Sequence, residues 1–235
     1  FFVAFRLPNT FRRLFAEGTF NAAFIPSYTA AKLKNKKKGE KFADDVLSIL
    51  LLVLIFIVTL AEIFTPYLIY LIAPGFVTDD IKFNLAVELT RITFPFLLFI
   101  SLASFFSGVL NSNNKFAAAA AAPIILNVVL IVVLCISYIE NFNIAKQLSY
   151  GVTIAGILQL IFLIIFTYRF YKPKIKFLFK ISREVKFFFK KLLPSIFSSG
   201  VTQINILVGT IIASFQSGAV SYLYYAERVY QINLA

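Results

Sequence analysis

The sequence contains no histidine and a single cysteine, Cys135, in 235 residues. These residues therefore cannot form an internal disulfide, and they hold no cluster of the usual zinc ligands. A histidine general base is excluded as well. Cys135 sits inside an apolar run, so we expect it to serve only in packing. These absences exclude several common classes of enzyme.

Motifs that carry catalysis are also missing from the sequence. There is no glycine loop to cradle a phosphate, no aspartate pair typical of a metal-dependent glycosyltransferase, and no nucleophile elbow. We therefore predict that the protein is not an enzyme and that it works without a cofactor. Coupling to an ion gradient or to the membrane potential stays open.

Apolar residues are abundant instead, at 60% of the chain with 29 phenylalanines. A soluble domain of this length has too little interior to bury so many apolar side chains. A membrane span needs roughly 20 mostly apolar residues. Such runs lie at residues 46–70, 116–138 and 148–168. The fold class predicted is all-α, a polytopic transmembrane helix bundle.

Seven helical segments are expected, at residues 1–31, 46–72, 81–110, 116–138, 148–168, 192–216 and 219–235. The first starts with Phe1 rather than Met, follows no signal peptide and reads as the middle of a helix. The last stops before it could cross a bilayer. We expect the chain to be a piece of a larger membrane protein, with a hydrophobic helix cut short at each end.

The net charge of +12 could indicate nucleic acid, but the positions of the basic residues argue against it. Sixteen of the 23 lie in the predicted loops at residues 32–45, 111–115 and 169–191, whereas the intervening loops hold only Lys146. The positive-inside rule places the basic loops in the cytoplasm. With phenylalanines between its charges, the loop at 169–191 is predicted to lie on the inner membrane surface and to contact anionic lipids.

Five basic residues fall inside hydrophobic segments: Arg6, Arg12, Arg13, Arg91 and Arg228. A charge in mid-membrane costs about 3 kcal/mol and normally faces a bundle interior or a water-filled cavity. In the first segment one helical face is polar, because its members follow at steps of three or four: Arg6, Asn9, Arg13, Glu17 and Asn21. Arg12 lies about 100° to the side of this stripe.

Two further patterns bear on these segments. Pro8, Gly18 and Pro26 weaken the first segment and predict a bend or break in it. Glu88 and Arg91 are spaced i, i+3, and a pair between them would explain how both are tolerated.

Guanidinium groups that share one cavity repel each other unless an anion joins them, and their planar forks suit phosphate. The arginines therefore indicate an anionic, phosphorylated ligand. The alternative is structural: Arg13 pairs with Glu17, and Arg228 with Glu227 or another helix, only to lower the cost of insertion. The spacing of the residues leaves both open.

Four stretches resemble, in the same order and spacing, segments of the MurJ (MviN) family of lipid II flippases. They are FFVAFRLPNTFRRLFAEGTFNAAFIPSYT, YLIAPGF, RITFPFLLFISLASFFSGVLNSNNKFAAAAAAPIILN and SYLYYAERVYQ. Members of this family belong to the multidrug/oligosaccharidyl-lipid/polysaccharide (MOP) exporter superfamily and have two helical lobes around a cationic cavity. The resemblance implies that residues 1–216 form the N-terminal lobe without its first helix, and that 219–235 begin the next helix.

The resemblance also implies a function. Family members carry lipid II, the undecaprenyl-pyrophosphate-linked peptidoglycan precursor, across the bacterial cytoplasmic (inner) membrane by alternating access. By position, the arginines that the family requires fall on Arg12 and Arg228. Arg13 and Glu17 neighbour them in the cavity, and Arg6 matches a basic position. We expect the pyrophosphate to dock on Arg12, Arg13 and Arg228.

Two departures from the family pattern are visible: the alanine run at 117–122, and Glu227 where aspartate is common. Neither changes the charge pattern. Rival functions are an exporter of another lipid-linked oligosaccharide, a drug antiporter of the same superfamily, or a membrane enzyme acting on polyprenyl phosphates. A structural scaffold would require every buried arginine to be paired. The oligomeric state stays open.

Overall fold

The computed structural model describes residues 1–16, 19–176 and 182–234. Within these ranges the chain forms α-helices and one short 3-10 helix and contains no strand. The predicted all-α class is confirmed. The elements are α1 (Phe2–Ala16), α2 (Thr19–Lys34), α3 (Lys36–Ile63), α4 (Thr65–Ile72), η1 (Pro74–Phe76), α5 (Asp80–Thr93), α6 (Phe96–Asn111), α7 (Phe116–Ile139), α8 (Ile144–Thr167), α9 (Arg183–Ser214) and α10 (Ala219–Leu234).

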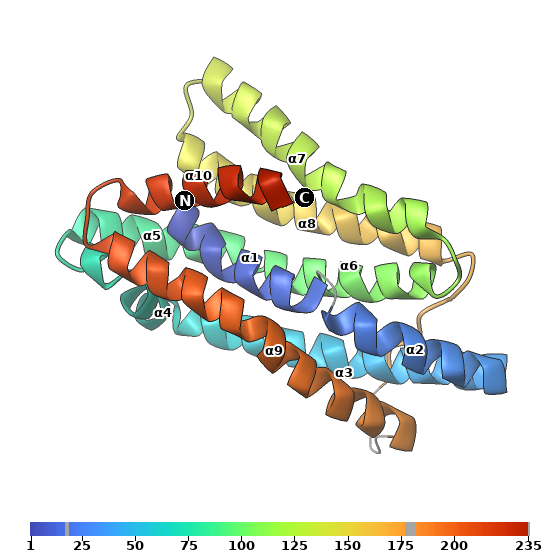
Figure 1. Cartoon of the computed structure of the whole chain (residues 1–235). Coiled ribbons are helices and arrows are strands. Elements are labelled where there is room, and N and C mark those ends of the chain that lie inside the picture. Colours follow the sequence, from blue (N-terminus) through green and yellow to red (C-terminus); the bar gives the residue numbers. More distant parts are fainter. Residues whose placement is uncertain (17–18, 177–181, 235) are drawn as a thin grey trace.

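Four stretches of the described residues are long and apolar enough to cross a membrane. They are α3, α5 together with α6, α7, and α8. The helices run side by side as a bundle, with α1 packed against α5, α6, α9 and α10 (Figure 1). The predicted transmembrane bundle is therefore confirmed, whereas the proposed division at residue 216 stays a prediction.

Three of the predicted segments each comprise two helices. Residues 46–72 divide at Phe64, just before Pro66, and 81–110 divide at Phe94 and Pro95. Proline lacks an N–H donor, so a helix restarts there more readily than it continues. In residues 1–31, Pro8 and Pro26 lie inside α1 and α2. The described helices end and restart on either side of residues 17–18, and the predicted weak point Gly18 lies outside the described residues.

Two helices begin well before their apolar runs. The Asn35 side chain accepts a hydrogen bond from the backbone N–H of Lys37 at 2.9 Å, so α3 starts ten residues before the predicted position 46. The Ser182 hydroxyl likewise accepts from the N–H of Val185 at 3.4 Å and caps α9. Capping side chains fix these starts, because the first N–H groups of a helix need hydrogen-bond acceptors. The start of the apolar run does not determine where the helix begins.

A cluster of buried aromatic rings joins α2, α3, α6 and α9. Its members are Phe20, Phe24, Phe42, Phe105 and Phe188. Phe24 is central, with ring centroids of its neighbours 5.1 to 6.2 Å away. Phe188 is fully buried in this cluster. The prediction that residues 169–191 lie along the membrane surface is therefore wrong for Phe188, which packs against protein.

Helices α2 and α6 approach closely at Gly108. A Cβ atom on Gly108 would lie 2.6 Å from Asn21 Oδ1 and 2.9 Å from Phe24 Cδ1. A larger residue at position 108 would force the Asn21 and Phe24 side chains to shift, since small residues are what let membrane helices pack at short range. The contact holds the first half of α2 against α6.

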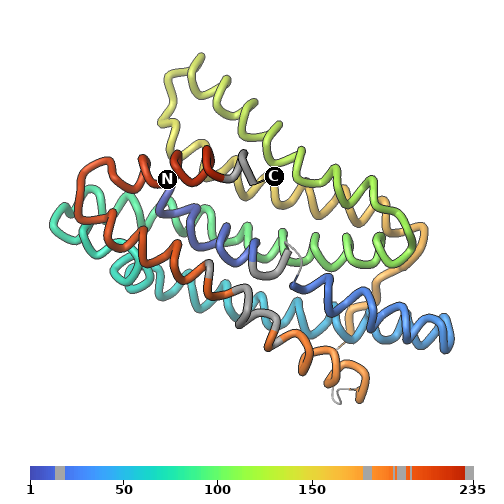
Figure 2. Tube along the Cα trace, viewed as in Figure 1, coloured from blue at the N-terminus to red at the C-terminus, as the bar shows by residue number. Residues whose placement is uncertain are grey.

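Helix α7 lies at the edge of the bundle and packs mainly against α8 (Figure 2). Only 6% of its most apolar window is buried inside the protein. Cys135 lies on this helix and is exposed. The expectation that Cys135 serves in packing is wrong within these residues, because the apolar run of α7 faces away from the other helices.

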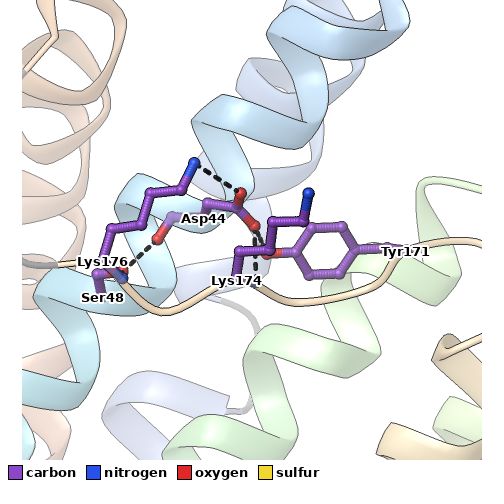
Figure 3. A network of polar contacts seen from close by, with 5 residues as sticks. All are labelled: Asp44, Ser48, Tyr171, Lys174 and Lys176. Atoms are coloured by element: carbon purple, nitrogen blue, oxygen red, sulfur yellow. Dashed lines mark hydrogen bonds and ion pairs between the residues drawn. The ribbon is translucent and has the colours of Figure 1, made fainter.

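The link from α8 to α9 is fastened to the start of α3 (Figure 3). The buried Asp44 carboxylate accepts a hydrogen bond from the Tyr171 hydroxyl at 2.6 Å and from the Lys174 N–H at 3.1 Å. Lys176 adds an ion pair to Asp44 at 3.6 Å, and its N–H donates to Ser48 Oγ at 3.1 Å. This network lies at the end of the bundle that carries residues 32–45, 111–115, 169–176 and 182–191, hereafter the basic end.

Candidate functional site

An ion pair joins the first and last described helices. Arg6 Nη1 of α1 lies 2.5 Å from Glu227 Oε2 of α10. The Arg6 side chain is only 4% exposed and that of Glu227 is 20% exposed. Because Coulomb attraction is strong where water is scarce, this pair is a principal polar link between α1 and α10.

Tyr224 lies between two arginines at this link. The Arg228 Nη2 atom donates to the Tyr224 hydroxyl at 2.9 Å, and its guanidinium lies 5.0 Å from the ring centroid. The Arg6 guanidinium lies 5.8 Å from the same ring, which also stacks on Phe2 at 4.3 Å. Both distances fit cation–π contacts. The structure therefore brings Arg6, Glu227 and Arg228 together around one tyrosine.

Tyr224 was not among the residues predicted from the sequence. It precedes Glu227 by three positions and Arg228 by four, which places all three on neighbouring parts of one helical face. That spacing was the signal in the sequence that could have identified Tyr224 as part of the site. An aromatic residue at this position is easily interpreted as an ordinary packing residue.

The polar stripe of α1 carries buried guanidinium nitrogens. Among the described residues, Arg6 Nε, Arg6 Nη2 and Arg13 Nε are buried and have no hydrogen-bond partner. A buried donor without an acceptor costs about 1–3 kcal/mol, and more when it is charged. Arg6 and Arg13 are seven residues apart and so lie on the same side of the helix. An anion placed along this stripe would supply the acceptors.

Arg12 faces a different side of α1. Its Nε donates to Asn9 Oδ1 at 3.0 Å. The side chain lines a cavity of about 130 Å³ between α1, α6, α7 and α8, together with Ser104, Ser107 and Gln159. Gln159 Nε2 is buried there without a partner among the described residues. The structure thus separates Arg12 from the α1–α10 link that holds Arg6 and Arg228.

Glu17, the fifth predicted site residue, lies outside the described residues. The alternative pairing of Arg13 with Glu17 therefore stays a prediction. Arg13 sits in the last turn of α1, where a positive charge also favours the helix C-terminus. The predicted use of Arg6, Arg12, Arg13, Glu17 and Arg228 in binding stays a prediction.

The pair expected between Glu88 and Arg91 is replaced by another. Glu88 Oε1 lies 2.6 Å from Lys146 Nζ of α8, and both side chains are nearly half exposed. Arg91 is exposed on α5. Packing of α5 on α8 brings the lysine within reach, which spacing along one helix cannot indicate.

The part of the chain that the structure describes contains no group of three His, Cys, Asp or Glu side chains that could hold a metal ion. The polar groups gathered near α1 are instead arginines, amides, hydroxyls and one carboxylate. Such a set can hold an anion by charge and by hydrogen bonds. It offers no pair of acid and base of the kind found in hydrolases.

A family model described as "Lipid II flippase MurJ" matches residues 1–235. The chain is 43% identical over 240 residues to a "Probable lipid II flippase MurJ" of Rickettsia prowazekii (strain Madrid E), covering 99% of this chain and 46% of that protein. It is 39% identical over 245 residues to a "Probable lipid II flippase MurJ" of Rhizobium meliloti (strain 1021), covering 100% and 45%.

A solved structure is similar over nearly the whole chain. "Lipid II flippase MurJ, inward closed conformation" superposes with a TM-score of 0.81 at 30% identity, covering 98% of this chain and 47% of that one. The chain therefore spans about half the length of the relatives that it matches.

Proposed function

The chain belongs to the family of MurJ lipid II flippases, and from this membership we propose that its protein carries lipid II from the inner to the outer leaflet of a membrane. The curated relatives bear this function in their names, and the fold is shared over 98% of the chain. Under this proposal the protein is a transporter rather than an enzyme, and it acts in peptidoglycan synthesis.

The buried guanidinium donors of α1 are the observation that carries the proposed site. Lipid II presents a pyrophosphate whose oxygens would accept from Arg6 and Arg13. Arg228 stands beside Arg6 across Tyr224, so the same anion could bridge α1 and α10. We place Arg12 in the site by the family resemblance, from the adjoining cavity.

Binding and conformational change would be linked through Glu227. In the structure this carboxylate accepts a hydrogen bond from Arg6 Nη1. A pyrophosphate that approaches α1 would compete with Glu227 for Arg6, because both are anionic acceptors. Loss of the ion pair would free α10 to move relative to α1. A ligand shifts a conformational equilibrium only if it binds one conformation more tightly than the other. The pyrophosphate would bind more tightly to the conformation in which Glu227 has left Arg6.

The cell biology follows from the same proposal. The membrane is the bacterial cytoplasmic membrane, the residues of the basic end face the cytoplasm, and the lipid tail stays in the bilayer during transport. The protein would need no cofactor. Coupling to an ion gradient or to the membrane potential stays open.

Depletion of the cell's own flippase tests the proposal. The full-length protein should restore growth and remove the lipid II that accumulates in the inner leaflet, whereas Arg12→Ala and Arg228→Ala should insert normally and fail to restore growth. Arg91→Ala is the matched control, since Arg91 is exposed on α5. Accumulation of another lipid-linked oligosaccharide would favour a related exporter, and unimpaired rescue by both variants would remove the proposed role of these arginines.

A further inference from the structure

A second cavity lies at the basic end, between α2, α3 and the first turns of α9. Its volume is about 560 Å³, which is within the range of ligand pockets. It shares no lining residue with the cavity beside Arg12, and none of the five predicted site residues lines it. The transport proposal therefore leaves this cavity without a role.

The cavity has a basic lining. Four lysines contribute to it, from all three helices: Lys34, Lys38, Lys41 and Lys191. Two carboxylates, Asp45 and Glu184, line it as well, so four positive groups face two negative ones. Asp45 is buried in the wall, whereas Glu184 is exposed at the rim. The balance favours an anion, and phosphate suits several ammonium groups at once.

The walls of the same cavity are apolar. Pro26 and Ala30 line it from α2, Phe42 from α3 and Phe187 from α9. The Lys191 ammonium lies 4.5 Å from the centre of the Phe187 ring, so charge and apolar surface meet at one edge. A free phosphate ion would leave these walls uncovered. An amphiphile would use both parts, with its phosphate on the lysines and its first methylene groups on the walls.

We propose that this cavity binds the phosphodiester head group of an anionic phospholipid from the cytoplasmic leaflet. Basic pockets between transmembrane helices on the cytoplasmic side are suited to such head groups. The fifteen lysines and arginines at 32–41 and 169–191 would raise the local concentration of anionic lipid around the cavity. A lipid held there would join α2 and α3 to α9. The proposal rests on the predicted cytoplasmic position of the basic end and not on lipid II transport.

Native mass spectrometry of the full-length protein tests the site. The purified protein is titrated with phosphatidylglycerol and, separately, with zwitterionic phosphatidylcholine. We expect one phosphatidylglycerol to remain bound at detergent concentrations that remove phosphatidylcholine. The double variant Lys38→Gln/Lys41→Gln should weaken this retention by about tenfold or more, since it removes two of the ammonium groups that line the cavity and would contact the phosphate.

The control is Lys36→Gln/Lys37→Gln, which removes the same charge from the first turn of the same helix but from residues that do not line the cavity. It should leave retention within about twofold of the parent. Equal loss in the two double variants would mean diffuse attraction to a charged surface and would overturn the proposal. Equal retention of the two lipids by the parent protein would also overturn it.

A variant that fills the cavity without changing charge completes the test. Ala30→Phe should release phosphatidylglycerol while the protein keeps its thermal transition, because Ala30 is exposed and lines the cavity. Retention by Ala30→Phe would place the lipid elsewhere and contradict the proposal. Displacement of phosphatidylglycerol from the parent by an equal concentration of a polyprenyl pyrophosphate would assign the cavity to the transport path and also contradict it.

Discussion

Arg6 and Glu227 are 221 positions apart in the sequence, yet their side chains meet at 2.5 Å between α1 and α10. Glu227→Gln should destabilise the protein by about 3–5 kcal/mol, since it leaves a buried guanidinium without its counter-charge. Arg6→Gln should cost less, because Glu227 keeps some access to water. Thermal unfolding in detergent measures both.

The half-exposed pair of Glu88 and Lys146 provides the control for this prediction. Glu88→Gln should change stability by less than about 1 kcal/mol. If Glu88→Gln and Glu227→Gln destabilised the protein equally, burial would not explain the contribution of the Arg6–Glu227 pair to stability. The exchanged variant Arg6→Glu/Glu227→Arg should recover part of the loss.

Tyr224 gives a prediction about transport. Tyr224→Phe keeps the ring between Arg6 and Arg228 but removes the hydroxyl that Arg228 bonds, so transport should fall by about tenfold or less. Tyr224→Leu also removes the cation–π contacts and should reduce transport further. Rescue of flippase-depleted cells, with protein levels matched, measures the series. Activity in the order Leu above Phe would contradict this role.

Gly75 tests the contact between η1 and the end of α9. Its N–H donates to Ser214 Oγ at 3.0 Å, and a Cβ added there would lie 2.3 Å from the Ser214 carbonyl oxygen. Gly75→Ala must therefore push these segments apart, and we expect a loss of about 1–3 kcal/mol in unfolding free energy. In Gly200→Ala, a new Cβ meets nothing within 4 Å and should stabilise α9 by up to about 1 kcal/mol.

The network around Asp44 predicts how the link between α8 and α9 responds to protease. Tyr171→Phe removes a buried hydroxyl donor from Asp44, so the link should detach more often and trypsin should cut faster after Lys174 and Lys176. Tyr168→Phe, which changes an exposed tyrosine at the end of α8, should leave the cleavage rate unchanged. Equal rates in the two variants would show that the hydrogen bond does not hold the link.

The same phenol predicts alkaline sensitivity. Burial, and then the hydrogen bond to Asp44, raise the pKa of Tyr171 above its ordinary value. The unfolded chain loses this proton near pH 10, whereas the folded chain keeps it. The stabilisation is therefore complete below about pH 10 and falls as the pH rises further. Above that pH the parent protein should lose stability faster than Tyr171→Phe, as urea titrations in detergent would measure.

Single long apolar runs were predicted closely, because their ends are marked in the sequence. Helix α7 matches the range 116–138 within one residue, whereas α8 ends one residue before position 168 but begins four residues before position 148. Starts set by caps were missed: Asn35 and Ser182 begin helices several turns before the apolar runs. Hydrophobicity indicates which residues can enter the bilayer, while hydrogen bonding decides where the helix begins.

The candidate site was predicted in part. Helical spacing placed Arg6 and Arg13 on one face of α1, and both carry buried donors. Spacing could not supply the partner, since the sequence offers Arg228 as the neighbour of Glu227 and the fold brings Arg6 to it. It also could not show that Arg12 borders α6, α7 and α8. Contacts between helices depend on packing, which periodicity within one helix does not encode.

The exposed thiol of Cys135 makes α7 a natural attachment point for a spectroscopic probe. Because these 235 residues hold no other cysteine, a spin label on Cys135 would report from a single position in this part of the protein. A second cysteine introduced on the outward face of α10 would then give a pair of labels. Changes in the distance between them, recorded with and without a pyrophosphate lipid, would follow the separation of α10 from the rest of the bundle during a transport cycle.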